Sequence, residues 1–151
     1  MNRDEIKEIL PHREPMLLVD EVHTNEDGTV TGSYTVRGDE FFLQGHFPGN
    51  PIVPGVILCE IAAQCSCLLM ADKVKGKTTL YAGMNNVKFK APVHVGDTIE
   101  ITCTFIRSIG PFYFMKAEGK NAGKLALTGE FSFALLDNDK VKNAQNAQNE
   151  Q

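Results

Sequence analysis

The sequence predicts an α+β domain in which an antiparallel β-sheet surrounds one long central helix. Several segments alternate apolar and polar residues with a period of two, which is typical of strands with one buried and one solvated face. By contrast, residues 56–71 are apolar on nearly every side and contain neither Gly nor Pro, as expected of a helix buried all round. The length of 151 residues is that of a single domain.

The predicted strands account for most of the chain. The clearest alternation places Ile99, Ile101, Cys103 and Phe105 on one face, so we expect these four side chains to be buried. The other segments repeat this pattern with varying regularity. The predicted strands are residues 30–36, 80–90, 99–105, 111–118 and 125–135.

Glycine-containing turns separate neighbouring strands. Asp27-Gly28, Gly110-Pro111 and residues 121–123 have the composition of hairpin turns. At the start of the chain, residues 1–15 predict a short helix that is stopped by Pro11, because proline cannot continue a helix.

The composition is that of an ordinary folded domain. Hydrophobic residues make up 42% of the chain and charged residues 23%, which excludes a fully disordered, collagen-like or coiled-coil chain. Residues 137–151 are rich in Asn and Gln and have little apolar content. We therefore expect one domain at residues 1–136 and a flexible tail at residues 137–151.

Charge and cysteine usage restrict the partners and the compartment. The net charge of −4 disfavours a nucleic-acid partner or an anionic membrane surface, both of which attract clustered Lys and Arg. We find no apolar run of ~20 residues and no signal-peptide pattern at the start. The cysteines form no CxxC pair, and free buried thiols favour a reducing compartment, the cytoplasm. They are Cys59, Cys65, Cys67 and Cys103.

An unusual loop precedes the predicted helix and carries the first candidate for chemistry. Residues 45–55, GHFPGNPIVPG, contain three prolines and three glycines, which predicts a stiff loop that fixes His46. The loop brings Gly55 to the helix N-terminus, where unpaired N–H groups can receive a developing oxyanion. Glu60 follows about one turn later, and burial is expected to raise the pKa of its carboxyl. An imidazole and a protonated carboxyl form a base and acid pair.

Three segments carry a specific resemblance. They are LPHREPMLLVDEV at residues 10–22, GHFPGNPIVPGVILCEIAAQ at 45–64 and NVKFKAPVHVGDTIEI at 86–101. Together they resemble, in order, the signatures of the (3R)-hydroxyacyl-[acyl-carrier-protein] dehydratases of bacterial fatty-acid synthesis. With Glu at position 60 the chain resembles the broad-specificity branch of this family, whereas the branch that also isomerises the double bond usually has Asp there. Asn50 and Glu14 depart from residues common in the family, His and Tyr.

The resemblance implies a hotdog fold and a homodimer, usually assembled into a hexamer as a trimer of dimers. It implies that His46 and Glu60 are the catalytic pair, supplied to each site by opposite protomers. The backbone N–H of Gly55 would hold the thioester carbonyl. It implies dehydration of a (3R)-hydroxyacyl thioester on an acyl carrier protein to a trans-2-enoyl thioester. The thioester already acidifies C2, so neither a metal nor an organic cofactor is expected.

Further residues are expected to contact substrate or carrier. Gln64, one turn after Glu60, is predicted to hydrogen-bond its carboxyl or to face a partner protomer. The residues expected to bind substrate are Phe47, Pro54, Gly55, Val56, Gln64 and Phe89. A tunnel for the acyl chain needs apolar side chains, and the candidates, each of which could instead be an ordinary core residue, are Phe47, Ile57, Met84 and Phe89. An acidic carrier protein implies a basic docking surface, for which the candidates are Lys88, Lys90 and Arg13, and further Arg37 and Lys116. The alternative is that these basic side chains are simply solvated on a strand face.

Three other functions remain open at this point. A hotdog thioesterase would use Glu60 to activate water, although His46 within its loop argues against this. A non-catalytic acyl-binding subunit would need neither residue. A zinc site formed by Cys65, Cys67 and a His is disfavoured, because the spacing of the two cysteines points their thiols apart on a helix.

Overall fold

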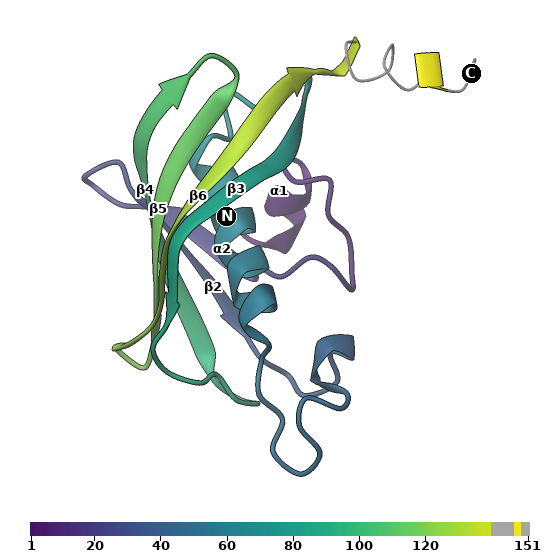
Figure 1. Ribbon diagram of the computed structural model, residues 1–151, viewed down its shortest axis with the longest axis vertical. Coiled ribbons are helices and arrows are strands. Elements are labelled where there is room, and N and C mark those ends of the chain that lie inside the picture. Colours follow the sequence, from purple (N-terminus) through teal and green to yellow (C-terminus); the bar gives the residue numbers. More distant parts are fainter. Residues whose placement is uncertain (140–146, 149–151) are drawn as a thin grey trace.

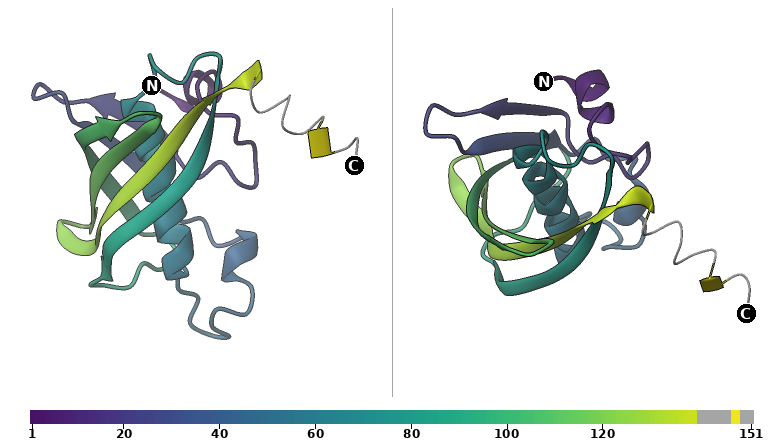
Figure 2. Two further views of the ribbon diagram at one scale, coloured as in Figure 1. Left: turned by 45° about the horizontal axis from the view of Figure 1, so that its top comes forward. Right: turned by 90° about the horizontal axis from the view of Figure 1, so that it is seen from above.

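In the computed structural model, which describes residues 1–139 and 147–148, a six-stranded antiparallel sheet curves around one long helix (Figures 1 and 2). This is the predicted hotdog arrangement. The predicted tail lies largely outside the described residues. The elements are α1 Arg3–Lys7, β1 Glu21–Thr24, β2 Val30–Thr35, a 3₁₀ turn Phe41–Leu43, α2 Gly55–Leu69, β3 Lys77–Phe89, β4 Thr98–Ile109, β5 Phe112–Asn121 and β6 Lys124–Asp137.

The sheet has the order β1-β2-β4-β5-β6-β3, so β1 and β3 form its two edges. The three predicted hairpin turns join β1 to β2, β4 to β5 and β5 to β6. All five predicted strands are present, and β1 is an additional strand of four residues. The 13-residue strand β3 pairs only with β6, so its other edge is open along the sheet.

The central helix α2 confirms the prediction from its apolar composition. It begins at Gly55, directly after Pro54, and its inward positions are covered by the concave face of the sheet (Figure 2). From Ile61 to Leu68 every residue is buried, including the polar Gln64 and Ser66. No helix in the described ranges is long and apolar enough to cross a membrane.

One expectation about the outer elements is wrong. Phe105 was expected to be buried with its neighbours on β4, but its side chain is 45% exposed, whereas Ile99, Ile101 and Cys103 are fully buried. Phe105 pairs in register with the buried Met115 and so keeps the predicted face, but from Thr104 onward every residue of β4 is exposed. The register with β5 shifts only after this pair, between Phe105 and Arg107. The predicted short helix is present as α1, and it ends at Lys7, before the chain reaches Pro11.

Residues 8–20, between α1 and β1, run over α2 and are tied to it. The Leu18 N–H donates to Gln64 Oε1 at 2.9 Å, and Gln64 Nε2 donates to the Met16 carbonyl at 2.7 Å. Leu17, Leu18 and Val19 join the core. This N-terminal segment therefore forms one wall beside the helix.

Candidate active site

His46 is held by the proline-rich loop through its own backbone neighbours. Its Nδ1 lies 2.9 Å from the carbonyl oxygen of Ile52, and its ring stacks on Phe47 with the centroids 4.4 Å apart. Because a carbonyl only accepts hydrogen bonds, Nδ1 carries the hydrogen and Nε2 keeps its lone pair. The loop therefore presents Nε2 as a base.

The N-terminus of α2 lies in the same surface hollow as His46, which is also lined by Gly55, Phe89 and Lys90. A Cβ at position 55 would lie 2.8 Å from Phe89 Cζ, so only glycine lets this ring pack on the helix start. The first N–H groups of a helix have no intrahelical acceptors and carry its positive dipole end. Beside them Val56 is 74% exposed. The hollow thus combines a base with oxyanion donors.

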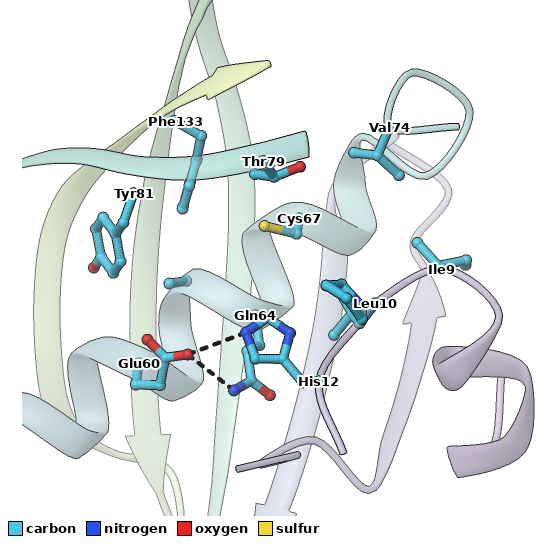
Figure 3. Close-up of a pocket in the computed structure, with 12 residues that line it drawn as sticks. Ile9, Leu10, His12, Glu60, Gln64, Cys67, Val74, Thr79, Tyr81 and Phe133 are labelled. Carbon is cyan, nitrogen blue, oxygen red and sulfur yellow. Dashed lines mark hydrogen bonds and ion pairs between the residues drawn. The ribbon is translucent and has the colours of Figure 1, made fainter. Parts of the chain in front are cut away.

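Glu60 lies in a separate cavity of about 150 Å³ between α2, the N-terminal segment and the sheet (Figure 3). Its walls are largely apolar, and Tyr81 brings a hydroxyl group, which lies 3.4 Å from the Cys59 carbonyl. The cavity thus places the Glu60 carboxyl beside apolar side chains. The walls include Ile9, Leu10, Val74, Tyr81 and Phe133.

Two side chains approach the Glu60 carboxyl. Gln64 Nε2 donates to Glu60 Oε1 at 3.0 Å, which confirms the predicted hydrogen bond. His12 Nε2 lies 3.4 Å from the same oxygen (Figure 3). Gln64 is only 1% exposed and its other bonds go to the N-terminal segment, so it does not face a partner protomer.

The expected rise in the pKa of Glu60 is wrong for the single chain. Burial does act to raise this pKa, and it is the largest single influence. The contacts from His12 and Gln64 favour the carboxylate and together outweigh burial, so the pKa lies below its ordinary value of 4.5. Glu60 is therefore an ionised, partly buried carboxylate in this state.

His46 and Glu60 do not share a cavity within one chain. Glu60 lies five positions after Gly55, and at 3.6 residues per turn this places the two residues roughly 140° apart around the helix. One face of α2 meets the His46 hollow and another meets the Glu60 cavity.

The apolar tunnel candidates occupy different environments. Phe47, Met84 and Phe89 are each more than half exposed, so they are not core residues of this chain. Ile57 is half-buried and packs against the core. Phe89 alone among them lines the His46 hollow.

The basic candidates also separate. Arg13 donates to the carbonyls of Leu10, His12 and Lys7, so its guanidinium fastens the N-terminal segment. Lys90 lines the His46 hollow, whereas Lys88 lies in another surface hollow with Lys116.

Comparisons with known proteins give the family and the fold of this chain. The family model described as ApeI-like, ApeI dehydratase, matches residues 22–129. A protein of Clostridium perfringens named 3-hydroxyacyl-[acyl-carrier-protein] dehydratase FabZ is 43% identical over 137 residues, covering 89% of this chain and 99% of the relative. One of Lactococcus lactis with the same name is 44% identical, covering 89% and 95%. The chain belongs to the FabZ dehydratase family.

Solved structures support the fold of this FabZ-family chain. The dehydratase heterocomplex ApeI:P from Xenorhabdus doucetiae contains a chain with a TM-score of 0.79 and 20% identity, covering 93% of this chain and 97% of that one. A homologue of HP0420 from Helicobacter felis matches with a TM-score of 0.68 and 16% identity, covering 90% and 89%. At such identities the similarity establishes the hotdog architecture only.

Reasoning from the sequence missed two polar residues that line the Glu60 cavity of this FabZ-family chain, His12 and Tyr81. His12 stands inside the quoted LPHR string, and this was a signal that could have been used. Tyr81 lies on the predicted strand 80–90 with no local mark of function. Cys67 also lines the Glu60 cavity, while Cys65 packs against Gly32, so the two thiols point apart. No cluster of three or more His, Cys, Asp or Glu suited to a metal occurs among the described residues.

Proposed function

We propose that this protein dehydrates (3R)-hydroxyacyl thioesters of acyl carrier protein to trans-2-enoyl thioesters during fatty-acid elongation. The observation that carries the proposal is a fixed imidazole with a free Nε2 beside a helix N-terminus, in a chain that also holds a carboxyl in an apolar cavity. Membership of the FabZ family supports the same chemistry.

The reaction is a β-elimination. His46 Nε2 takes a proton from C2, and the Gly55 N–H stabilises the enolate-like carbonyl oxygen. Glu60 gives its proton to the 3-hydroxyl, which leaves as water while the C2–C3 double bond forms. Each proton-transfer group contributes about 10²–10⁴-fold, and one oxyanion donor about 3–4 kcal/mol. The cycle ends with imidazolium and carboxylate, which exchange a proton through water.

Glu60 must carry a proton before it can act as the acid. Substrate that fills the apolar cavity removes water from the carboxyl, and desolvation is already the largest influence on its pKa. Further desolvation therefore raises the pKa and favours the protonated form.

A homodimer completes the site in this proposal. Because one chain keeps His46 and Glu60 in separate cavities, a second copy would bring one chain's imidazole to the other chain's carboxyl. The open edge of β3, with exposed Leu80 and Met84, supplies a surface for such a partner. The outer half of the β4–β5 hairpin is a second apolar surface, which supports assembly of dimers into a hexamer. It exposes Phe105, Ile106, Ile109 and Phe112.

The proposal extends to an acyl carrier protein as partner and to the cytoplasm as compartment. Lys90 at the edge of the His46 hollow is the best placed candidate for contact with an acidic carrier protein. Lys88 and Arg13 remain candidates, although the guanidinium of Arg13 already binds three carbonyls. Four buried free thiols fit the reducing cytoplasm.

The decisive experiment incubates the protein with a (3R)-hydroxybutyryl thioester and follows enoyl absorbance and free thiol together. We expect enoyl product from the wild type and a loss of at least 100-fold in His46→Ala. His23→Ala, at an exposed position on β1, is the matched control and should keep full activity. Wild-type rates in His46→Ala would exclude this base.

The same assay separates the alternative functions. Free thiol without enoyl product would identify a thioesterase that uses Glu60. No product even from the carrier-linked substrate would indicate an acyl-binding subunit without catalysis.

A further inference from the structure

His12 lies on the N-terminal segment and reaches across to the central helix. Its Nε2 is 3.4 Å from Glu60 Oε1, and the side chains of both residues are mostly buried, at 30% and 23% exposure. In Figure 3 the imidazole lies against the carboxyl on the side where Gln64 also approaches it. Glu60 is thus held from two different parts of the chain.

The second nitrogen of His12 indicates which tautomer the site accepts. Nδ1 is buried and has no hydrogen-bond partner among the described residues. A buried N–H without an acceptor is rarer in proteins than an under-used acceptor, so the hydrogen belongs on Nε2 and the lone pair on Nδ1. The neutral ring then points its N–H at Glu60.

We propose that His12 is a positioning residue that, together with Gln64, holds the Glu60 carboxyl in the orientation from which it gives its proton to substrate. This inference rests on the proposed dehydratase function. His12 acts through Glu60, because among the described residues the Glu60 carboxyl is the one polar group that its Nε2 contacts.

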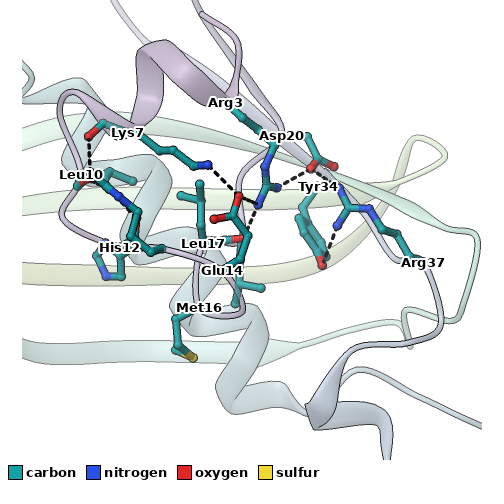
Figure 4. Close-up of polar contacts among 12 residues, drawn as sticks. Arg3, Lys7, Leu10, His12, Glu14, Met16, Leu17, Asp20, Tyr34 and Arg37 are labelled. Atoms are coloured by element: carbon teal, nitrogen blue, oxygen red, sulfur yellow. Dashed lines mark hydrogen bonds and ion pairs between the residues drawn. The ribbon is translucent and has the colours of Figure 1, made fainter.

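The N-terminal segment is firmly anchored, so His12 can act as a fixed support. Arg3 binds Glu14 at 3.1 Å and Asp20 at 2.9 Å, one on either side of the stretch that bonds Gln64 (Figure 4). Arg37 binds the same Asp20 oxygen at 2.7 Å. These ion pairs join the segment, at Glu14 and Asp20, to Arg3 on α1 and to Arg37 just after β2.

Few other ionisable groups face this pair in the described structure. Cys67 on α2 and Tyr81 on β3 line the same cavity, and burial raises the pKa of both side chains, which keeps them neutral near pH 7. Among the described residues that line this cavity, His12 is thus the ionisable side chain that contacts Glu60, alongside the uncharged Gln64.

The test compares His12→Ala with His12→Gln, in which an amide N–H replaces the imidazole N–H. In dehydration assays we expect His12→Ala to lower kcat about 10- to 100-fold with KM within twofold, because an acid displaced by about 1 Å loses such factors. His12→Gln should recover most of kcat. Loss of the donor raises the pKa of Glu60, so the alkaline limb of the kcat profile should move to higher pH in His12→Ala.

A second readout needs no activity. The pKa of the Glu60 carboxyl, followed by carbon NMR or infrared titration in the free protein, should rise in His12→Ala and return towards the wild-type value in His12→Gln. If His12→Ala does not fold, His12→Leu fills the same space without a donor and takes its place.

Three results would overturn the inference. If the alkaline limb of the kcat profile is unchanged in His12→Ala and only the stability falls, the role of His12 is structural. If that limb moves to lower pH in His12→Ala, His12 is a proton source. A kcat within twofold of wild type would remove any role. Absence of enoyl product from the wild type would instead reject the proposed function, while the Glu60 titration would still decide the contact.

Discussion

Gln64→Ala tests how much the link between the central helix and the N-terminal segment stabilises the fold. Gln64 is 1% exposed, accepts from the Leu18 N–H and donates to the Met16 carbonyl and to Glu60. Truncation leaves the two backbone groups without their partner, and water has little access to replace it.

The expected cost follows from those two groups. Each buried polar group left unsatisfied costs about 1–3 kcal/mol, so the free energy of unfolding should fall by about 2–6 kcal/mol. For a domain of this size the Tm should fall by at least about 4 °C. Activity should fall as well, because Glu60 loses one of the two side chains that orient it.

Urea unfolding at one fixed protein concentration measures the change, since association of copies also adds stability. Ser66→Ala is the matched control on the same helix. Ser66 is fully buried, but its hydroxyl donates to the Ala62 carbonyl within the helix, so its loss should cost no more than about 1 kcal/mol. A Gln64→Ala loss no larger than that of Ser66→Ala would refute the reasoning.

Three further predictions concern packing, thiols and acid. Gly32→Ala should cost about 1–3 kcal/mol in urea unfolding, because its Cβ would overlap the Cys65 thiol, and Cys65→Ala in the same chain should restore part of this. The four buried thiols should resist a thiol reagent in the native protein and react in denaturant, since burial raises the pKa of Cys67 and Cys103 to about 12. The free energy of unfolding should decrease as the pH is lowered below about 4.5. The folded-state pKa values of Glu40 and Glu60 lie below this ordinary value, so each carboxylate stabilises the fold until it is protonated.

Each of these has a clear contrary result. Wild-type stability in Gly32→Ala would show that β2 and α2 are not in close contact there. Rapid reaction of any native thiol would contradict its burial. A free energy of unfolding that rises on acidification would mean that the carboxylates are not stabilised by folding.

The sequence alone determined the architecture and the part of the candidate site that contains His46 and Gly55. The run at 56–71 without Gly or Pro predicted α2 to within two residues at either end, because a helix apolar all round has only one stable place, inside the sheet. Period-two alternation and turn residues predicted the strands and the hairpins. The proline-rich loop placed His46 and Gly55 together, because such a loop constrains its own backbone.

Tertiary packing decided the rest, for reasons no local pattern contains. The contact between Leu18 and Gln64 joins residues 46 positions apart, and the approach of His12 to Glu60 depends on the same long-range packing. Sequence reasoning could foresee that burial raises the pKa of Glu60, but the sign of the shift was set by two donors that the fold brings to it. The exposure of Phe105 likewise reflects where the buried part of β4 ends, at Cys103, which alternation along a single strand does not reveal.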